Sequence, residues 1–163
     1  MSEAITRVGL AAKRGLTAAN PVLVELKSWL EQRGVTPVFD EDTARLAGIR
    51  TARSISREAL PRECDLVVVL GGDGTLIGMA DRIAAAESDV PILAVNFGSL
   101  GFLTEITLAE LYEALDDTLA GRAVIDTRAL LSTKTIRDGA SFAEHIVLND
   151  MVITRGSLSR IIE

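Results

Sequence analysis

The feature that most constrains the fold is a short apolar run that ends in a glycine-rich turn. Residues 66–70 read Leu-Val-Val-Val-Leu, which is the length and β-branched content of a strand buried on both faces. The run stops at residues 71–74, Gly-Gly-Asp-Gly, and Thr75 is placed to cap a helix that opens at Leu76. A strand that turns through glycines into a helix N-terminus offers free backbone N–H groups and a favourable dipole to an anion. The segment therefore predicts a phosphate-binding turn.

Asp73 modifies this interpretation, because a carboxylate repels a bare phosphate. In such a turn it can take a proton from an attacking hydroxyl, hold a divalent cation or accept hydrogen bonds from a ribose. The alternative is a plain tight turn in which aspartate is merely a favoured residue. The buried strand before Asp73 and the helix after it favour the functional interpretation.

A second glycine-rich strand exit follows the first. Residues 92–95 read as the next buried strand, and residues 96–103 continue as Asn-Phe-Gly-Ser-Leu-Gly-Phe-Leu. In an open parallel sheet, ligands bind outside the carboxyl ends of the strands, so both exits should open into one crevice. The structural alternative places Phe102 and its apolar neighbours in the core, but it leaves Asn96 and the glycines unexplained.

Strand and helix patterns alternate around this central unit. Residues 5–11 and 35–39 read as strands, and Asn20 is placed to cap the helix between them. This order predicts a parallel pair of strands joined by a right-handed crossover. Further along, Thr107 and Glu110 match a capping box that precedes a leucine stripe, which predicts one more helix.

The connection over residues 40–62 is basic, and the sequence pattern predicts its structure less clearly than that of the other segments. It contains five arginines, Arg45, Arg50, Arg53, Arg57 and Arg62. Two interpretations are open. The arginines belong either to a mobile flap that helps to neutralise polyphosphate, or to a solvated connection that carries charge on its outside, and the second is favoured.

The pattern changes near residue 122. Residues 128–136 and 142–154 are β-rich and flank the hairpin signal Asp138-Gly139. We therefore expect an α/β domain over residues 1–122, with an open, parallel, Rossmann-like sheet that binds nucleotide or phosphate. Residues 123–163 are expected to begin an all-β domain that is truncated here, because so few strands cannot close a sandwich or barrel.

Composition excludes several classes of protein. The formal net charge of -6 argues against a general nucleic-acid-binding protein, although a phosphorylated substrate remains compatible with it. No apolar run is long enough for a membrane span or for the core of a signal peptide. Cys64 is a lone cysteine, so a cytoplasmic location is expected, and His145 has no partner at ligand spacing, so no protein metal site is predicted.

Three motifs together resemble those of the NAD kinase family. They are residues 70–75, residues 96–103 and Asn149-Asp150, in that family's order and at its approximate spacing. Diacylglycerol, sphingosine and sugar kinases share the glycine turn or a close relative of it, but the second motif points to NAD kinases. The resemblance implies transfer of a phosphoryl group from ATP or inorganic polyphosphate to the 2′-hydroxyl of the adenosine ribose of NAD, which gives NADP.

The resemblance also implies roles for particular residues. Asp73 would accept the proton of the ribose hydroxyl, and Phe102 would lie beside the adenine. Asn149 and Asp150 would bind the nicotinamide-side ribose, and Arg160 would contact the nucleotide. The complete set of nucleotide-binding residues that the resemblance implies is Gly71, Gly72, Asp73, Gly74, Thr75, Asn96, Phe102, Asn149, Asp150 and Arg160.

Members of this family usually need a divalent cation such as Mg²⁺ and assemble as dimers or tetramers through the β domain. That domain carries a Gly-Ser-Thr-Ala type motif that this sequence lacks, so the chain by itself is expected to be inactive or nearly so. Beyond the glycine turn, Lys13 and Arg14 are the local candidates for binding the donor triphosphate. Two alternatives stay open: a lipid or sugar kinase that shares the glycine turn, and a non-catalytic nucleotide-sensing module.

Overall fold

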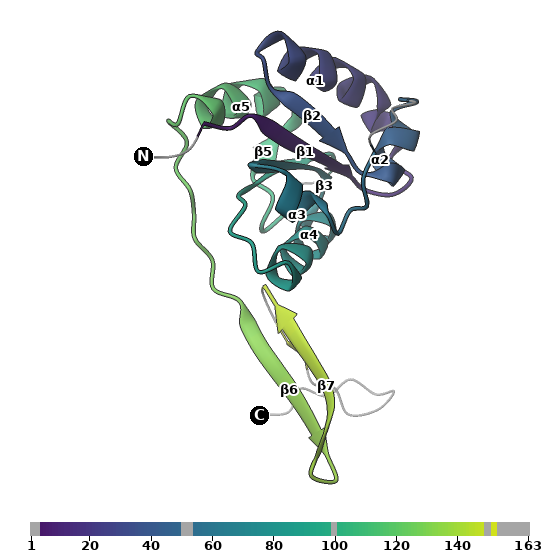
Figure 1. The fold of residues 1–163 in the computed structure, drawn as a ribbon, viewed down its shortest axis with the longest axis vertical. Helices are drawn as coiled ribbons and strands as arrows, with labels where there is room; N and C mark the ends of the chain where they lie inside the picture. Colours follow the sequence, from purple (N-terminus) through teal and green to yellow (C-terminus); the bar gives the residue numbers. More distant parts are fainter. Residues whose placement is uncertain (1–3, 50–53, 99–100, 149–150, 153–163) are drawn as a thin grey trace. The chain divides into compact units, whose positions relative to one another are not determined.

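The computed structural model describes residues 4–49, 54–98, 101–148 and 151–152 of the chain. They belong to two compact units, residues 1–125 and residues 126–163. The first unit is an open five-stranded parallel sheet with flanking helices, and the second contains a two-stranded antiparallel sheet (Figure 1). The predicted fold class, a Rossmann-like α/β unit followed by β structure, is confirmed.

Strands and helices alternate along the first unit. Its strands are β1 (Arg7–Ala12), β2 (Thr36–Phe39), β3 (Leu66–Gly71), β4 (Ile92–Asn96) and β5 (Ile106–Thr107). Its helices are α1 (Asn20–Gln32), α2 (Glu41–Leu46), α3 (Leu60–Glu63), α4 (Asp73–Ala85) and α5 (Leu111–Leu119). The strand order is β2-β1-β3-β4-β5, so the apolar run of β3 forms the centre of the sheet.

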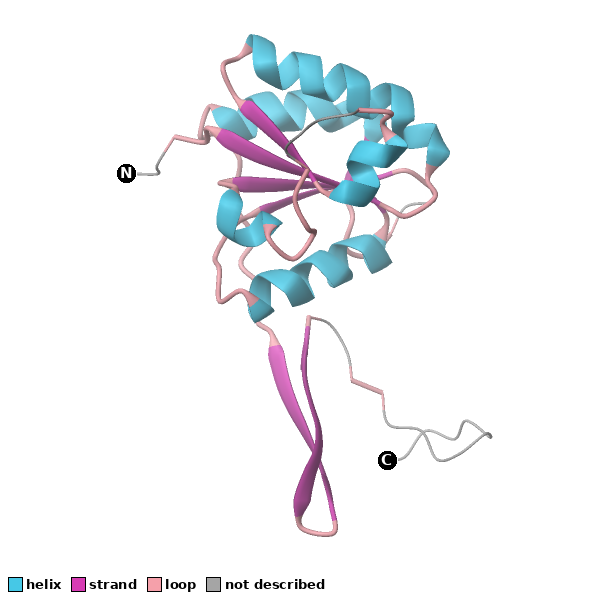
Figure 2. Ribbon diagram, turned by 45° about the vertical axis from the view of Figure 1, so that its right-hand side comes forward, coloured by secondary structure: helices cyan, strands magenta, loops and turns pink. Residues whose placement is uncertain are grey.

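Every residue of β3 is buried, because helices cover both faces of the sheet (Figure 2). Leu66, Val68 and Leu70 belong to the apolar cluster that contains side chains of α1 and α5. Val67 and Val69 alternate with them and belong to the opposite cluster, which includes side chains from α3 and α4. A continuous apolar strand is therefore what a two-sided core requires.

The register aligns the carboxyl ends of three neighbouring strands. Ala12 pairs with Leu70, and Gly71 pairs with Asn96. The backbone continues this alignment past the strand ends, since Lys13 N donates to Leu70 O at 2.8 Å and Phe97 N donates to Gly71 O at 2.8 Å. The two glycine-rich exits thus leave adjacent strands at the same edge of the sheet.

Two predicted helix caps were wrong. Helix α4 begins at Asp73, and its N-cap is Gly72 in an extended conformation, so Thr75 lies within the first turn instead of capping it. Helix α1 is preceded by a 3₁₀ turn over Thr17–Ala19, so Ala19 occupies the cap position. The Asn20 side chain instead donates to Leu46 O at 2.9 Å. The predicted capping box of Thr107 and Glu110 is confirmed, and the Glu110 carboxylate accepts from the backbone N–H of Thr107 at 2.8 Å.

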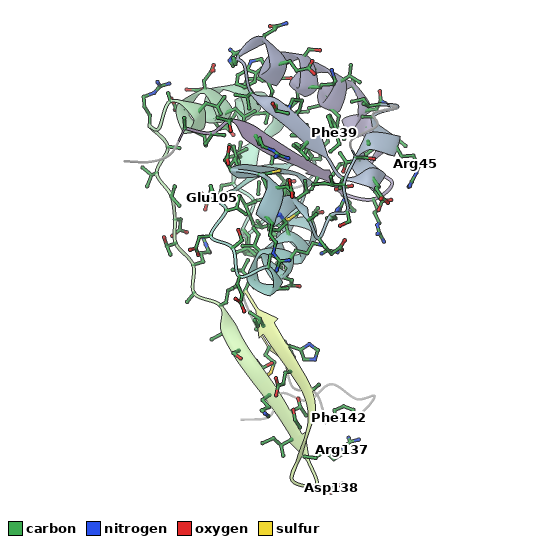
Figure 3. All side chains as sticks on the ribbon, in the orientation of Figure 1. Phe39, Arg45, Glu105, Arg137, Asp138 and Phe142 are labelled. Carbon is green, nitrogen blue, oxygen red and sulfur yellow. The ribbon has the colours of Figure 1, made fainter. Side chains whose placement is uncertain are left out.

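The second unit contains β6 (Leu131–Arg137) and β7 (Ala140–Val147). Asp138 and Gly139 both have positive φ, as a two-residue hairpin turn requires, so the predicted hairpin is confirmed. Next to the turn, the Arg137 guanidinium lies 4.8 Å from the centre of the Phe142 ring (Figure 3). Residues 153–163 lie outside the described part of the chain, and a larger β domain beginning at residue 123 stays a prediction.

No helix in the described part of the chain is long and apolar enough to cross a membrane.

Candidate active site

A cleft of about 820 Å³ opens at the carboxyl edge of the sheet in the first unit. Both glycine-rich exits line it, together with the loop after β1, residues of α4 as far as Arg82 and one arginine from the basic connection. Its lining residues are Lys13, Arg14, Leu16, Arg57, Gly71, Gly72, Asp73, Gly74, Thr75, Gly78, Met79, Arg82, Asn96, Phe97, Gly98, Gly101 and Phe102. The expectation that two neighbouring strand exits share one crevice is therefore met.

The glycines of the first turn differ in whether the protein leaves space for a side chain. A Cβ atom on Gly71 would lie 2.4 Å from Thr75 Oγ1 and 3.2 Å from Lys13 Cβ, so the fold itself requires glycine there. A Cβ atom on Gly72 or Gly74 would meet nothing within 4 Å. Because both residues line the cleft, open space beside them leaves room for a ligand to approach the backbone.

The Asp73 carboxylate points to the loop that precedes β5 and binds its backbone. Asp73 Oδ2 accepts a hydrogen bond from Phe102 N at 2.8 Å. Asp73 Oδ1 accepts from Leu103 N at 3.2 Å, from Thr104 N at 3.0 Å and from Thr104 Oγ1 at 2.9 Å. One side chain at the start of α4 therefore joins the two glycine-rich exits.

These hydrogen bonds are unequally shared between the two oxygens of Asp73. A carboxylate accepts about four hydrogen bonds, roughly two at each oxygen. Oδ1 already has three donors, whereas Oδ2 has one among the described residues. Partial desolvation raises the pKa of Asp73, but the hydrogen bonds, led by the one from the Phe102 N–H, outweigh it and lower the pKa below its usual value. Asp73 is thus an ionised acceptor at neutral pH with capacity left at Oδ2.

Two residues that sequence reasoning did not select complete this contact. Thr104 is buried and supplies two of the four donors to Asp73. A Cβ atom on Gly101 would lie 2.1 Å from Asp73 Oδ1 and 2.6 Å from Thr104 Oγ1. Gly101 could have been identified from its place in the second motif, but nothing in the spacing of the sequence marks Thr104.

Two other predicted residues of the second exit, Asn96 and Phe102, differ in their surroundings. Asn96 is buried at the end of β4, and its Oδ1 accepts from Gly98 N at 2.8 Å, which closes the turn. Phe102 lines the cleft with 95% of its surface exposed, so the interpretation of Phe102 as a core residue was wrong. Asn149, Asp150 and Arg160 lie outside the described residues, so their predicted roles stay predictions.

Four cations line the cleft, against one carboxylate among its described lining residues. Arg14 pairs with Asp42 at 2.7 Å and Arg82 with Glu58 at 3.2 Å. Lys13 has no ion-pair partner in the described part of the chain. The cleft is therefore lined mainly by cationic side chains, in a chain whose formal net charge is -6.

The basic connection is not uniform, so neither interpretation of it fits all of its arginines. Arg45 is exposed, pairs with Asp42 at 2.9 Å and projects from the surface (Figure 3). This position fits the interpretation of a solvated connection. Arg57 instead turns inward and pairs with the buried Asp40 at 2.8 Å. Arg50 and Arg53 lie outside the described residues. The inward position of Arg57 was not predicted.

Cys64 packs against the core at the amino end of β3, as expected for a structural cysteine. Burial raises the pKa of its thiol to about 12, so it stays protonated and unreactive at neutral pH.

The described residues include no group of three or more His, Cys, Asp or Glu side chains that could hold a metal ion. Asp73 is the carboxylate that lines the cleft, and three N–H groups and a hydroxyl already bind it. These residues suit a divalent cation that arrives bound to phosphate oxygens better than one that the protein holds alone.

Comparison with known proteins identifies the family. The sequence model of the ATP-NAD kinase N-terminal domain matches residues 8–123. The chain belongs to the NAD kinase family. The NAD kinase of Geobacter sulfurreducens is 44% identical over 157 residues, which are 96% of this chain and 54% of that protein. The NAD kinase of Solibacter usitatus is 41% identical over 98% of this chain and 54% of its own length. The chain thus spans about half the length of these relatives.

A solved structure has the same fold. Yeast NADH kinase, crystallised in complex with NADH, superposes with a TM-score of 0.71 at 21% sequence identity, over 88% of this chain and 47% of that one. The kinase motifs named from the sequence, residues 70–75 and 96–103, both fall inside the part of the chain that the family match covers.

Proposed function

We propose that the protein containing this chain phosphorylates the 2′-hydroxyl of the adenosine ribose of NAD to give NADP, with ATP or inorganic polyphosphate as donor. The observation that carries the proposal is the arrangement of the cleft. One ionised oxygen, Asp73 Oδ2, accepts a single hydrogen bond from the described residues and can accept another, and cationic side chains line the same cleft. A hydroxyl to be phosphorylated needs an acceptor for its proton, and the phosphates of the donor need positive charge near them.

Asp73 would act on the ribose hydroxyl through Oδ2. The hydroxyl oxygen attacks the terminal phosphorus of the donor, the bond from that phosphorus to the leaving phosphate breaks, and the hydroxyl proton passes to the carboxylate. The low pKa of Asp73 makes it a weak base, so the proton transfers late, once the new P–O bond has made the hydroxyl acidic. Four hydrogen bonds fix the carboxylate and hold Oδ2 in place for this contact.

Other residues of the cleft would bind the nucleotide. The exposed ring of Phe102 offers a face on which the adenine can stack, an interaction worth about 1–3 kcal/mol per base. Gly71, Gly72, Gly74, Thr75 and Asn96 would form the walls against which the nucleotide lies. A divalent cation such as Mg²⁺ would arrive with the donor phosphates and neutralise their charge. Homo-oligomeric assembly and a cytoplasmic location belong to the same proposal.

Replacement of Gly74 by alanine separates binding from stability. Gly74 lies in the first turn of α4 without a positive φ, and its missing Cβ faces open space, so alanine should stabilise the fold by about 0.4–1 kcal/mol. The same methyl group should obstruct the nucleotide and lower the affinity for NAD by about 10-fold or more. Calorimetric melting and an NAD titration measure both effects. Asp81→Ala, on an exposed position of the same helix, should raise the melting temperature with unchanged affinity for NAD.

The proposed function is tested by assaying the complete gene product on a panel of acceptors with Mg²⁺ and either ATP or polyphosphate. We expect NADP from NAD, and no phosphorylation of diacylglycerol or of hexose phosphates. Turnover of a lipid or sugar with none of NAD would identify a kinase that shares only the glycine turn. Tight binding of NAD or NADP without turnover would identify a nucleotide sensor.

A further inference from the structure

The cationic part of the cleft contains one arginine that is held unlike the others. Arg14 and Arg82 make ion pairs in which at least one partner is largely exposed. The Arg57 side chain is only 16% exposed, and its partner Asp40 is 1% exposed. Arg57 nevertheless lines the cleft, although it comes from the basic connection and not from either glycine-rich exit.

The contacts of Arg57 fix its guanidinium and leave one nitrogen available. Nε donates to Asp40 Oδ2 at 2.8 Å, and one terminal nitrogen, Nη2, donates to Ala12 O at 2.8 Å and to Thr43 Oγ1 at 3.4 Å. Asp40 is held in turn by Thr43, whose N and Oγ1 donate to it at 2.8 and 3.0 Å. The other terminal nitrogen, Nη1, has no acceptor in the described part of the chain, so its N–H groups remain available.

The position of Arg57 along the sheet edge places it beside the glycine turn. Its acceptor Ala12 ends β1, and the next residue, Lys13, lies so close to β3 that a Cβ atom on Gly71 would be 3.2 Å from Lys13 Cβ. The strand order β2-β1-β3-β4 then gives the sequence of groups along the edge: Arg57, Lys13, the glycine turn with Asp73, and Asn96. Arg57 and Lys13 therefore lie on the opposite side of the turn from Asn96 and β4.

Stability alone does not account for a buried pair of this kind. An apolar pair of similar volume often stabilises a fold equally well, because burial costs each charge its hydration. What an arginine supplies and an apolar residue cannot is a charged group with more than one donor nitrogen: Nε and Nη2 are held by the protein, and Nη1 can still donate to a phosphate oxygen. Asp40 holds the guanidinium in one orientation, so little side-chain entropy remains to be lost when an anion binds.

We propose that Arg57 is a donor-binding residue that contacts the phosphate chain of the phosphoryl donor through Nη1, next to Lys13. The ligand class is a linear polyphosphate, carried either by a nucleoside triphosphate or as inorganic tripolyphosphate. This assignment rests on the proposed function, since it concerns the donor half of the same cleft. It separates the roles of the residues: Asp73 acts on the acceptor, and Arg57 on the donor.

The test compares Arg57→Lys with wild type in the complete gene product. Lysine keeps the positive charge, but its single nitrogen cannot occupy the positions of Nε, Nη2 and Nη1 at once. We expect the KM for ATP and the dissociation constant of inorganic tripolyphosphate each to rise about 10- to 100-fold, as for loss of one charge-assisted hydrogen bond. The KM for NAD should stay within twofold. Arg45→Lys is the matched control, because Arg45 is exposed outside the cleft, and it should change none of these values.

The outcomes separate this inference from the function that it builds on. If wild type forms no NADP, the proposed function fails, and tripolyphosphate binding still tests Arg57. Unchanged donor constants in Arg57→Lys, an equal rise in the KM for NAD, or an effect on ATP without one on tripolyphosphate would each overturn the assignment. If Arg57→Lys does not fold, the wild-type protein is titrated instead and the ¹⁵N resonances of the Arg57 side chain are followed. They should shift with tripolyphosphate and not with NAD. The absence of a shift with tripolyphosphate would overturn the assignment.

Discussion

Replacing Asp73 by asparagine should lower the rate of NADP formation by about 10²- to 10⁴-fold, the range that a positioned proton acceptor contributes. An amide has one acceptor oxygen and one donor nitrogen, whereas the Asp73 site presents only donors. If the amide oxygen faces Leu103 and Thr104, the NH₂ group faces the Phe102 N–H, and no acceptor is left for the ribose hydroxyl. Steady-state kinetics with NAD and ATP measure the loss.

The matched control is Asp81→Asn, which makes the same chemical change at an exposed position of the same helix. It should leave kcat and both KM values unchanged. Full turnover in Asp73→Asn would show that the carboxylate is not the proton acceptor, and would reduce its role to holding the loop before β5.

Gly101→Ala should remove activity to a similar extent by moving the same carboxylate. The added Cβ would lie 2.1 Å from Asp73 Oδ1, a distance that real contacts do not allow. Since the clashing atom is the end of a side chain, Asp73 can rotate away, and the protein should stay folded while losing hydrogen bonds worth about 1–3 kcal/mol. Kinetics together with thermal melting distinguish displacement from unfolding.

Two comparisons sharpen the Gly101 prediction. The double variant Gly101→Ala with Asp73→Asn should be little worse than either single variant, because both act on one group. Glu105→Gln, at an exposed position of the same loop, should retain activity. Wild-type turnover in Gly101→Ala would mean that Asp73 functions in a position different from the one observed.

Much of the scaffold could be predicted from the sequence because it follows from local patterns. A buried apolar run such as β3 specifies a central strand, and the glycines after it specify a turn at the carboxyl edge. The helix caps were predicted less well. Thr75 and Asn20 are good capping residues, but the backbone already placed Gly72 and Ala19 in those positions.

The contacts within the cleft were not predictable, since they join residues far apart in the sequence. The bonds from Thr104 to Asp73 and from Arg57 to Asp40 depend on how the strands are ordered, and neither partner carries a local signal of the pairing. Phe102 shows the converse. Its apolar character suggested a core position, but the ring is exposed and lines the cleft.

The central claim is that Asp73 Oδ2 accepts a hydrogen bond from the 2′-hydroxyl of the adenosine ribose. It is tested most directly by titrating wild type and Asp73→Asn with NAD and with its 2′-deoxyadenosine analogue. In wild type, loss of the hydroxyl should weaken binding by about 10- to 100-fold, the value of one hydrogen bond to a charged group. In Asp73→Asn the two ligands should bind alike. An equal loss of affinity in both proteins would contradict the account, because the hydroxyl would then be bound by some other group.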